Sequence, residues 1–138
     1  MTELKDGIRD FVYGGNAIIT LESENTKNHF TYKIKQSKDK DNLYFVHLLR
    51  GPDNCEDYTY IGCIYSDNDR FHPSNKYKEI VLEFWPPSMR AIRYFFQNID
   101  NIPPKLHVYH EGRCARCGRL LTTPESIKRG FGPECCKL

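Results

Sequence analysis

Three cysteines near the C-terminal end of the sequence have the residue type and spacing of a zinc site. Cys114 and Cys117 form a C-x2-C pair directly followed by Gly118, and 17 residues separate Cys117 from Cys135. Two thiolates three positions apart can bind one ion where the backbone turns tightly, and glycine permits that turn. Four of the six cysteines lie in the last 25 residues. This clustering favours a metal site, and we predict that these three cysteines bind Zn²⁺.

The fourth ligand of such a zinc ion has two main candidates. His110 would place an imidazole just before the cysteine pair, whereas Cys136 directly follows Cys135. We favour His110, because adjacent cysteines in extended backbone point to opposite sides. His107, or no fourth ligand from the protein, is a further alternative. Four protein ligands leave no open position for water, so we expect a structural zinc and a protein that is not an enzyme.

A redox role is the alternative use of a C-x2-C pair. Redox-active pairs of the thioredoxin type open a helix that follows a strand. The residues after Cys117 read Gly-Arg-Leu-Leu-Thr-Thr-Pro, which is not a helix start. We therefore prefer the metal interpretation.

Three arginines, Arg113, Arg116 and Arg119, surround the cysteine pair. They are our candidates for contacting a nucleic acid or another partner, because arginine binds phosphate groups. The competing interpretation, which we favour, is that they bind loop carbonyls or lie in solvent. Residues 105–138 carry seven basic and three acidic side chains, a net charge of +4, which leaves −2 for the rest of a chain whose total is +2.

A second basic stretch, Lys33–Lys40, lies near Tyr32 and Tyr44. A basic hairpin beside aromatic side chains can bind single-stranded nucleic acid. Asp39 and Asp41 interrupt the positive charge. This stretch is therefore a weaker candidate for a nucleic-acid contact.

The elements that must position these residues begin with a sheet. Four segments alternate apolar and polar residues or are rich in β-branched and aromatic residues, with short polar connections: 17–21, 30–34, 43–49 and 58–64. Sequential strands with short connections indicate an antiparallel meander. Simple alternation puts Tyr58 and Tyr60 on one face and Tyr65 on the other. We expect residues 66–79 to be irregular and residues 80–84 to form a fifth strand or the lead-in to a helix.

One main helix is predicted to follow. Pro86 and Pro87 indicate its start, since proline is tolerated in the first helical turn, and the Asn98–Asn101 stretch its end. Apolar residues recur at helical spacing and predict a face that packs on the sheet: Met89, Ile92, Phe95, Phe96 and Ile99.

The chain then enters the cysteine-rich region through a short extended segment, residues 106–109. A second, short helix is predicted between Thr123, which can cap it, and Gly130, which ends it. The predicted fold is α+β: an antiparallel meander with one main helix in residues 1–104 and a small zinc-binding module in residues 105–138.

Several classes of protein are not indicated. No apolar stretch approaches the roughly 18 residues that span a membrane, and the N-terminal residues lack the apolar core of a secretory signal. We therefore expect a cytosolic protein with no membrane partner. Walker, G-x-G-x-x-G, G-x-S-x-G and H-E-x-x-H motifs do not occur in the sequence.

The run from His110 to Cys135 resembles an uncharacterised family of short zinc-ribbon-like domains found in bacteriophage and mobile-element proteins. The resemblance covers about 29 residues around the cysteines. The rest of the chain, residues 1–104 (the body), is only loosely similar to phage proteins that carry such a C-terminal segment. It implies a phage context, a bacterial host cytoplasm and a metal ligand set that includes Cys114, Cys117 and Cys135 and is compatible with His110. It implies no reaction.

These observations lead to one functional expectation with two alternatives. We expect a phage-type accessory protein that binds a host or phage macromolecule, most readily a protein, for example as an inhibitor of a bacterial defence system such as an anti-CRISPR. The first alternative is a nucleic-acid-binding zinc protein that uses the basic C-terminal module. The second is a small metal-dependent nuclease. The sequence makes no prediction of the oligomeric state.

Overall fold

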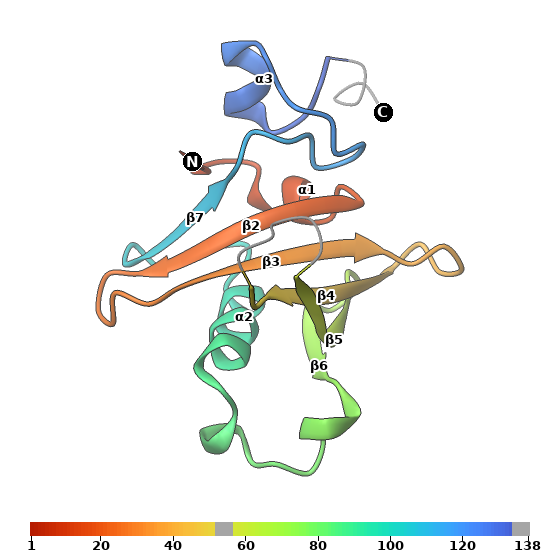
Figure 1. The fold of residues 1–138 in the computed structure, drawn as a ribbon, viewed down its shortest axis with the longest axis vertical. Coiled ribbons are helices and arrows are strands. Elements are labelled where there is room, and N and C mark those ends of the chain that lie inside the picture. Colours follow the sequence, from red (N-terminus) through yellow and green to blue (C-terminus); the bar gives the residue numbers. More distant parts are fainter. Residues whose placement is uncertain (52–56, 134–138) are drawn as a thin grey trace.

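One seven-stranded antiparallel sheet organises the fold, in a computed structural model that describes residues 1–51 and 57–133. Its strands lie in the order β1-β7-β2-β3-β4-β5-β6 (Figure 1). The strands are Thr2–Glu3 (β1), Asn16–Ser23 (β2), His29–Gln36 (β3), Leu43–Leu49 (β4), Tyr58–Tyr65 (β5), Arg70–Pro73 (β6) and Leu106–His110 (β7). The helices are Ile8–Val12 (α1), Pro87–Gln97 (α2) and Pro124–Arg129 (α3), with two short 3-10 helices at Asn75–Tyr77 (η1) and Leu82–Phe84 (η2). In the described ranges no helix is long and apolar enough to cross a membrane.

The strands from β2 to β6 form the predicted antiparallel meander, and the four predicted strands correspond to β2, β3, β4 and β5. The expectation for residues 66–79 was wrong in part, because they contain β6. This edge strand buries only Phe71, so its polar composition hides it from the sequence pattern. Residues 80–84 contain the 3-10 helix η2 and no strand.

Helix α2 packs on one face of the sheet, as predicted. It begins at Pro87, and its residues Met89, Ile92, Phe95 and Phe96 are fully or almost fully buried. They share a core with the inward-facing residues of the strands. The hydroxyl of Tyr32 on β3 donates a 2.5 Å hydrogen bond to the carbonyl of Ser88, which ties the helix to the centre of the sheet.

Near the ends of the described chain, β1 and α1 were not predicted, and β7 was predicted only as a short extended segment. The segment expected at 106–109 is β7, and it lies inside the sheet between β1 and β2. Helix α1 buries Phe11 and Val12 in the core. The first strand after the predicted boundary between residues 104 and 105 is thus a strand of the body's own sheet, and the division into two domains stays a prediction.

A histidine on β7 connects neighbouring segments at the β1 edge of the sheet. His107 on β7 lies between two carboxylates, with 2.8 Å from Nδ1 to Glu3 Oε2 and 2.6 Å from Nε2 to Glu24 Oε1. Hydrogen bonds to Glu3 and Glu24 raise the pKa of His107, because both carboxylates favour the doubly protonated ring. The ring thus links β1 to the β2–β3 turn.

Candidate metal centre

A tight hairpin presents the first two cysteines. Arg113 and Leu120 pair as an isolated antiparallel bridge, and the N–H of Cys114 donates to the carbonyl of Arg119 at 2.9 Å. The N–H of Gly118 returns to the carbonyl of Cys114 at 2.9 Å. Gly118 has φ +78°, the left-handed conformation that glycine adopts most easily, so it allows the turn directly after Cys117.

The surroundings of the Cys114 sulfur stabilise a negative charge on it. It is buried and accepts hydrogen bonds from the backbone N–H groups of Arg116 and Gly132, each at 3.4 Å. Burial by itself raises the pKa of this thiol, but N–H groups of Cys117, Gly132 and Arg116 outweigh burial and lower the pKa to about 7. A thiolate is the form that binds a metal, so the surroundings of Cys114 suit a metal ligand.

Helix α3 was predicted from its cap residues, and it brings the chain back to the sulfur of Cys114. The Thr123 hydroxyl accepts the N–H of Ser126 at 3.3 Å, and Pro124 is the first helical residue. Gly130 ends the helix with φ +82°. This short helix therefore brings Gly132 beside Cys114 Sγ, three residues before the predicted ligand Cys135. Cys135 and Cys136 lie outside the described residues.

The module is packed firmly on the body. Ala115 donates its N–H to Gly130 at 2.9 Å, and its carbonyl accepts the N–H of Asn16 at 2.7 Å. The amide of Asn16 also donates to the carbonyl of Arg116 at 2.7 Å. Phe11 of helix α1 packs edge-on against Phe131, with 6.1 Å between ring centroids. The hairpin and α3 are thus held against the start of β2 and against α1 (Figure 1).

His110, the predicted fourth ligand, is buried at the end of β7 with 1% of its surface exposed. Its ring lies 5.4 Å from the Phe11 ring, and its Nδ1 accepts the N–H of Gly112 at 3.0 Å. Burial lowers the pKa of His110, because the charged ring would lose its hydration. Nε2 is buried and has no hydrogen-bond partner within the described chain.

The structure brings Cys114 and Cys117 together but does not add His110 to them. In residues 1–51 and 57–133, no three His, Cys, Asp or Glu side chains form a group that could hold a metal. The sulfur of Cys117 lies within reach of Cys114, whose pKa it helps to lower. Any larger ligand set thus includes residues outside these two ranges, and the assignment of His110 or Cys136 stays a prediction.

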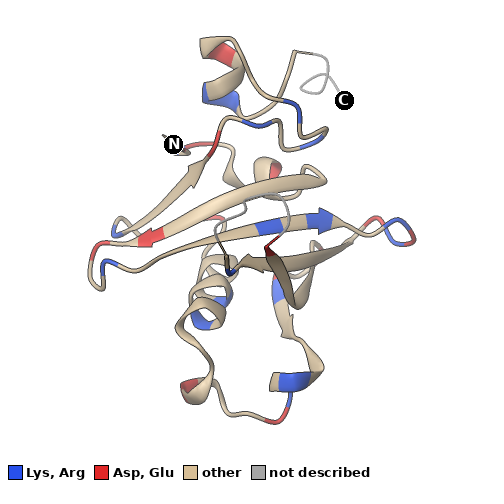
Figure 2. Cartoon of the chain, viewed as in Figure 1, with Lys and Arg blue, Asp and Glu red and all other residues tan. Residues whose placement is uncertain are grey.

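The candidate contact residues lie on the surface around the hairpin. Arg113, Arg116 and Arg119 are all exposed, and the Arg113 guanidinium donates to the Gly118 carbonyl at 3.2 Å. Figure 2 marks the positions of Lys and Arg in blue along the segment between β7 and α3 and on α3 itself. Tyr32 and Tyr44, by contrast, are buried in the core, so they cannot stack with nucleic-acid bases as the basic stretch on β3 had suggested.

Comparison with known proteins concerns mainly this module. Residues 104–137 match a family of unknown function, DUF6011. No curated protein and no solved structure gives a significant match. The cysteine-rich segment is therefore similar to an uncharacterised family, and the match carries no function.

Proposed function

We propose that the protein is a non-catalytic binding protein that docks on another protein through an exposed apolar arm. The arm consists of residues 74–86, between β6 and α2, and projects away from the sheet (Figure 1). The observation that carries the proposal is its exposed apolar surface. Ile80, Val81, Leu82 and Phe84 are 39%, 56%, 39% and 76% exposed. Large apolar side chains gathered on one surface segment are typical of protein interfaces.

The arm is ordered before it meets a partner. The Trp85 indole donates from Nε1 to the Ile80 carbonyl at 2.8 Å, and the backbone of η2 closes two further turns. The Trp85 ring packs edge-on against Phe71 of β6 at 6.2 Å and anchors the arm to the sheet. A preordered apolar segment loses little conformational entropy on binding, which favours affinity.

A structural zinc in the C-terminal module is part of the proposal. Cys114 and Cys117 would bind it together with Cys135 and with His110 or Cys136. The hydrogen bonds that Cys114 Sγ accepts from two backbone N–H groups support a thiolate ligand. The ion would hold the hairpin and α3 together, because these short elements bury little apolar surface by themselves. The phage context and the anti-defence role remain proposals based on the sequence resemblance.

The experiment compares capture of proteins from bacterial lysate by three immobilised forms: wild type, the arm variant V81D/F84D and the control L120D. Leu120 is 64% exposed on the cysteine hairpin, so it matches the arm residues in exposure but not in place. Burial of one large apolar side chain contributes about 1.5–3 kcal/mol, so the arm variant should lose more than about tenfold in affinity.

We expect wild type and L120D to retain the same protein after nuclease treatment and V81D/F84D to lose it. A photo-crosslinking residue at position 84 should join the captured protein to the arm. Equal capture by all three forms, or loss of capture after nuclease treatment, would contradict the proposal. Self-association of the wild type that V81D/F84D abolishes would identify a second copy of the chain as the partner.

A second candidate function, binding of single-stranded nucleic acid, is supported by the sheet face opposite α2. Cross-strand register places Lys35 beside Phe45 and Lys33 beside His47, which in turn pairs with Tyr60. The Tyr60 ring is 45% exposed and lies 6.1 Å from that of Phe45. Cationic and aromatic side chains in adjacent rows suit phosphates and bases.

The two candidates separate in a fluorescence-anisotropy titration with oligothymidylate at several salt concentrations. If this face binds nucleic acid, K33Q/K35Q and Y60A should weaken binding, and K38Q/K40Q, which changes the same charge in the neighbouring loop, should weaken it less. Absence of binding at low salt would remove this candidate. The metal-dependent nuclease stays a prediction without a supporting contact.

A further inference from the structure

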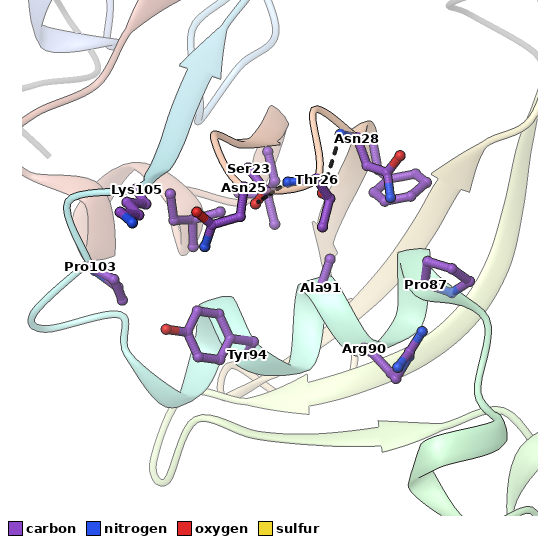
Figure 3. Close-up of a pocket in the computed structure, with 13 residues that line it drawn as sticks. Ser23, Asn25, Thr26, Asn28, Pro87, Arg90, Ala91, Tyr94, Pro103 and Lys105 are labelled. Carbon is purple, nitrogen blue, oxygen red and sulfur yellow. Dashed lines mark hydrogen bonds between the residues drawn. The ribbon is translucent and has the colours of Figure 1, made fainter.

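A cleft separate from both the arm and the cysteine module lies between helix α2 and the β2–β3 turn. Its volume is about 380 Å³, within the usual range for small-molecule sites. Figure 3 shows Pro87, Ala91 and Tyr94 of α2 facing Ser23, Asn25, Thr26 and Asn28 of the turn across it, with Pro103 and Lys105 closing one end.

The cleft is open because a small residue stands where its two walls are opposed. Ala91 is the smallest of the α2 residues that face the turn, and Pro87 and Pro103 form rigid borders. Apolar side chains from the sheet complete the lining: Leu21, Phe30 and Leu106. A ligand would therefore bury an apolar body between the helix and the sheet.

The charged groups of the cleft are all positive. Arg90 and Lys105 line it, and none of the described lining residues is a carboxylate. Neither cation forms an ion pair with any residue of the described ranges. Glu24, the acidic residue whose charge acts on Lys105, already binds Nε2 of His107 at 2.6 Å. An anionic ligand would thus meet two cations that no protein carboxylate pairs.

The turn supplies neutral polar groups that are held in place. Hydroxyls fix its backbone: Ser23 Oγ accepts the N–H of Thr26 at 3.4 Å, and Thr26 Oγ1 accepts the N–H of Asn28 at 3.3 Å (Figure 3). The side-chain amides of Asn25 and Asn28 and the hydroxyl of Tyr94 form no hydrogen bond with other described residues. They remain available to a ligand.

We propose that this cleft between α2 and the β2–β3 turn binds a small organic anion with an apolar body. The body lies between Ala91 and the apolar floor, the acidic group pairs with Arg90 or Lys105, and the asparagine amides contact polar substituents. The site shares no residue with the arm, so the test of this inference is independent of the protein-binding proposal.

The probe that tests it is 1-naphthalenesulfonate, added to the isotope-labelled wild-type chain while amide chemical shifts are followed. Two comparison compounds separate the contribution of the charge from that of the apolar body. 1-Naphthalenemethanol lacks the charge, and inorganic sulfate lacks the apolar body. We expect saturable shifts confined to residues around the cleft, with at least tenfold weaker binding of the neutral alcohol, since charge-assisted hydrogen bonds are the stronger ones. Sulfate should not saturate.

Variants locate the site. A91L should fill the cleft and abolish saturable binding. At least one of R90Q and K105Q should weaken it about fivefold or more, which shows the cation that pairs with the acidic group. F84S, in the arm, is the control for nonspecific adsorption of an aromatic anion to exposed apolar surface and should bind as wild type does. Each variant is first checked for a wild-type circular dichroism spectrum, and R90Q and K105Q together keep the test decisive if A91L does not fold. Shifts that map elsewhere, equal binding of the neutral alcohol, or unchanged binding in both charge variants would overturn the proposal.

Discussion

Replacing Gly130 with alanine is expected to destabilise the protein through one contact between the cysteine module and the core. Gly130 ends helix α3 at φ +82°, and its carbonyl accepts the N–H of Ala115. A Cβ atom at this position would lie 2.3 Å from Cδ2 and 2.6 Å from Cε2 of Phe11. Phe11 is fully buried, so its ring cannot leave without displacing core neighbours.

The expected magnitude has two parts. Holding a non-glycine residue in the left-handed conformation costs about 1–2 kcal/mol. Forcing an extra carbon into a packed core costs about 1–3 kcal/mol more. The free energy of unfolding should therefore fall by about 2–5 kcal/mol in G130A, a large share of the stability of a small domain.

A matched glycine isolates the steric part. Gly112 has φ +84°, yet a Cβ atom there would meet no atom within 4 Å. G112A should consequently lower the free energy of unfolding only by the cost of the left-handed backbone, about 1–2 kcal/mol. A smaller side chain should also relieve the clash, so G130A should cost less in an F11L background than in the wild type.

The assay is urea unfolding followed by circular dichroism, with nuclear magnetic resonance of the Phe11 ring as a local probe. We expect a lower urea midpoint for G130A than for G112A and shifted resonances of Phe11 in G130A alone. Equal midpoints for the two variants, with an unmoved Phe11 ring, would refute the packing argument.

Three other predictions concern the metal, the pH dependence and the core. If the proposed zinc is bound, C114S should lose it and unfold residues 111–133, whereas C63S on β5 should keep one zinc per chain. Metal analysis and amide spectra measure both, and a metal-free C114S protein with an ordered module would contradict the proposed structural role. The raised pKa of His107 means that its two glutamate contacts stabilise the fold fully below about pH 6.5, the ordinary histidine value, and that this contribution is lost as pH rises through the higher folded pKa. H107Q should remove that part of the pH dependence of the urea midpoint, and an unchanged profile would show that the contacts add no stability. Y32F should lower the free energy of unfolding by about 1–2 kcal/mol, because it leaves the buried Ser88 carbonyl without its 2.5 Å hydrogen bond; calorimetry that finds no loss would show that the carbonyl finds another partner.

Elements with local signals could be predicted from the sequence. Helix α3 follows from Thr123, Pro124 and Gly130, since each of these residues acts on the backbone beside it. Helix α2 follows from its prolines and its apolar spacing. The turn at Cys114–Cys117 likewise depends on residues within a few positions of one another, so both its tightness and the closeness of the two cysteines were foreseeable.

Features that depend on distant partners could not be predicted. Val46 pairs with Gly62 and His47 with Tyr60, so Ile61 is an extra residue in β5. This bulge puts Tyr65 on the same face as Tyr60, where simple alternation separates them. Gly62, next to Ile61, is compatible with a bulge, but only the pairing with β4 shows which residue is extra.

The surroundings of His110 depend on distant residues in the same way. Its spacing from the cysteines suggested a ligand, but its burial follows from Phe11, almost a hundred positions earlier in the chain, and from helix α3. The large apolar side chains of the arm are close together in the sequence, where they suggested a strand or the lead-in to a helix. Only the fold shows that these side chains are exposed.

The place of β7 in the sheet has a consequence for the order in which the chain can fold. Strand β1 pairs with β7, so residues 2–3 find their hydrogen-bonding partner only after residue 110 has left the ribosome. The meander from β2 to β6 and helix α2 can assemble earlier from neighbouring segments, whereas closing this edge joins positions more than a hundred residues apart. Such distant contacts form slowly. The edge of β2 therefore stays uncovered through most of synthesis, and a chaperone or an unwanted strand would meet the nascent protein there.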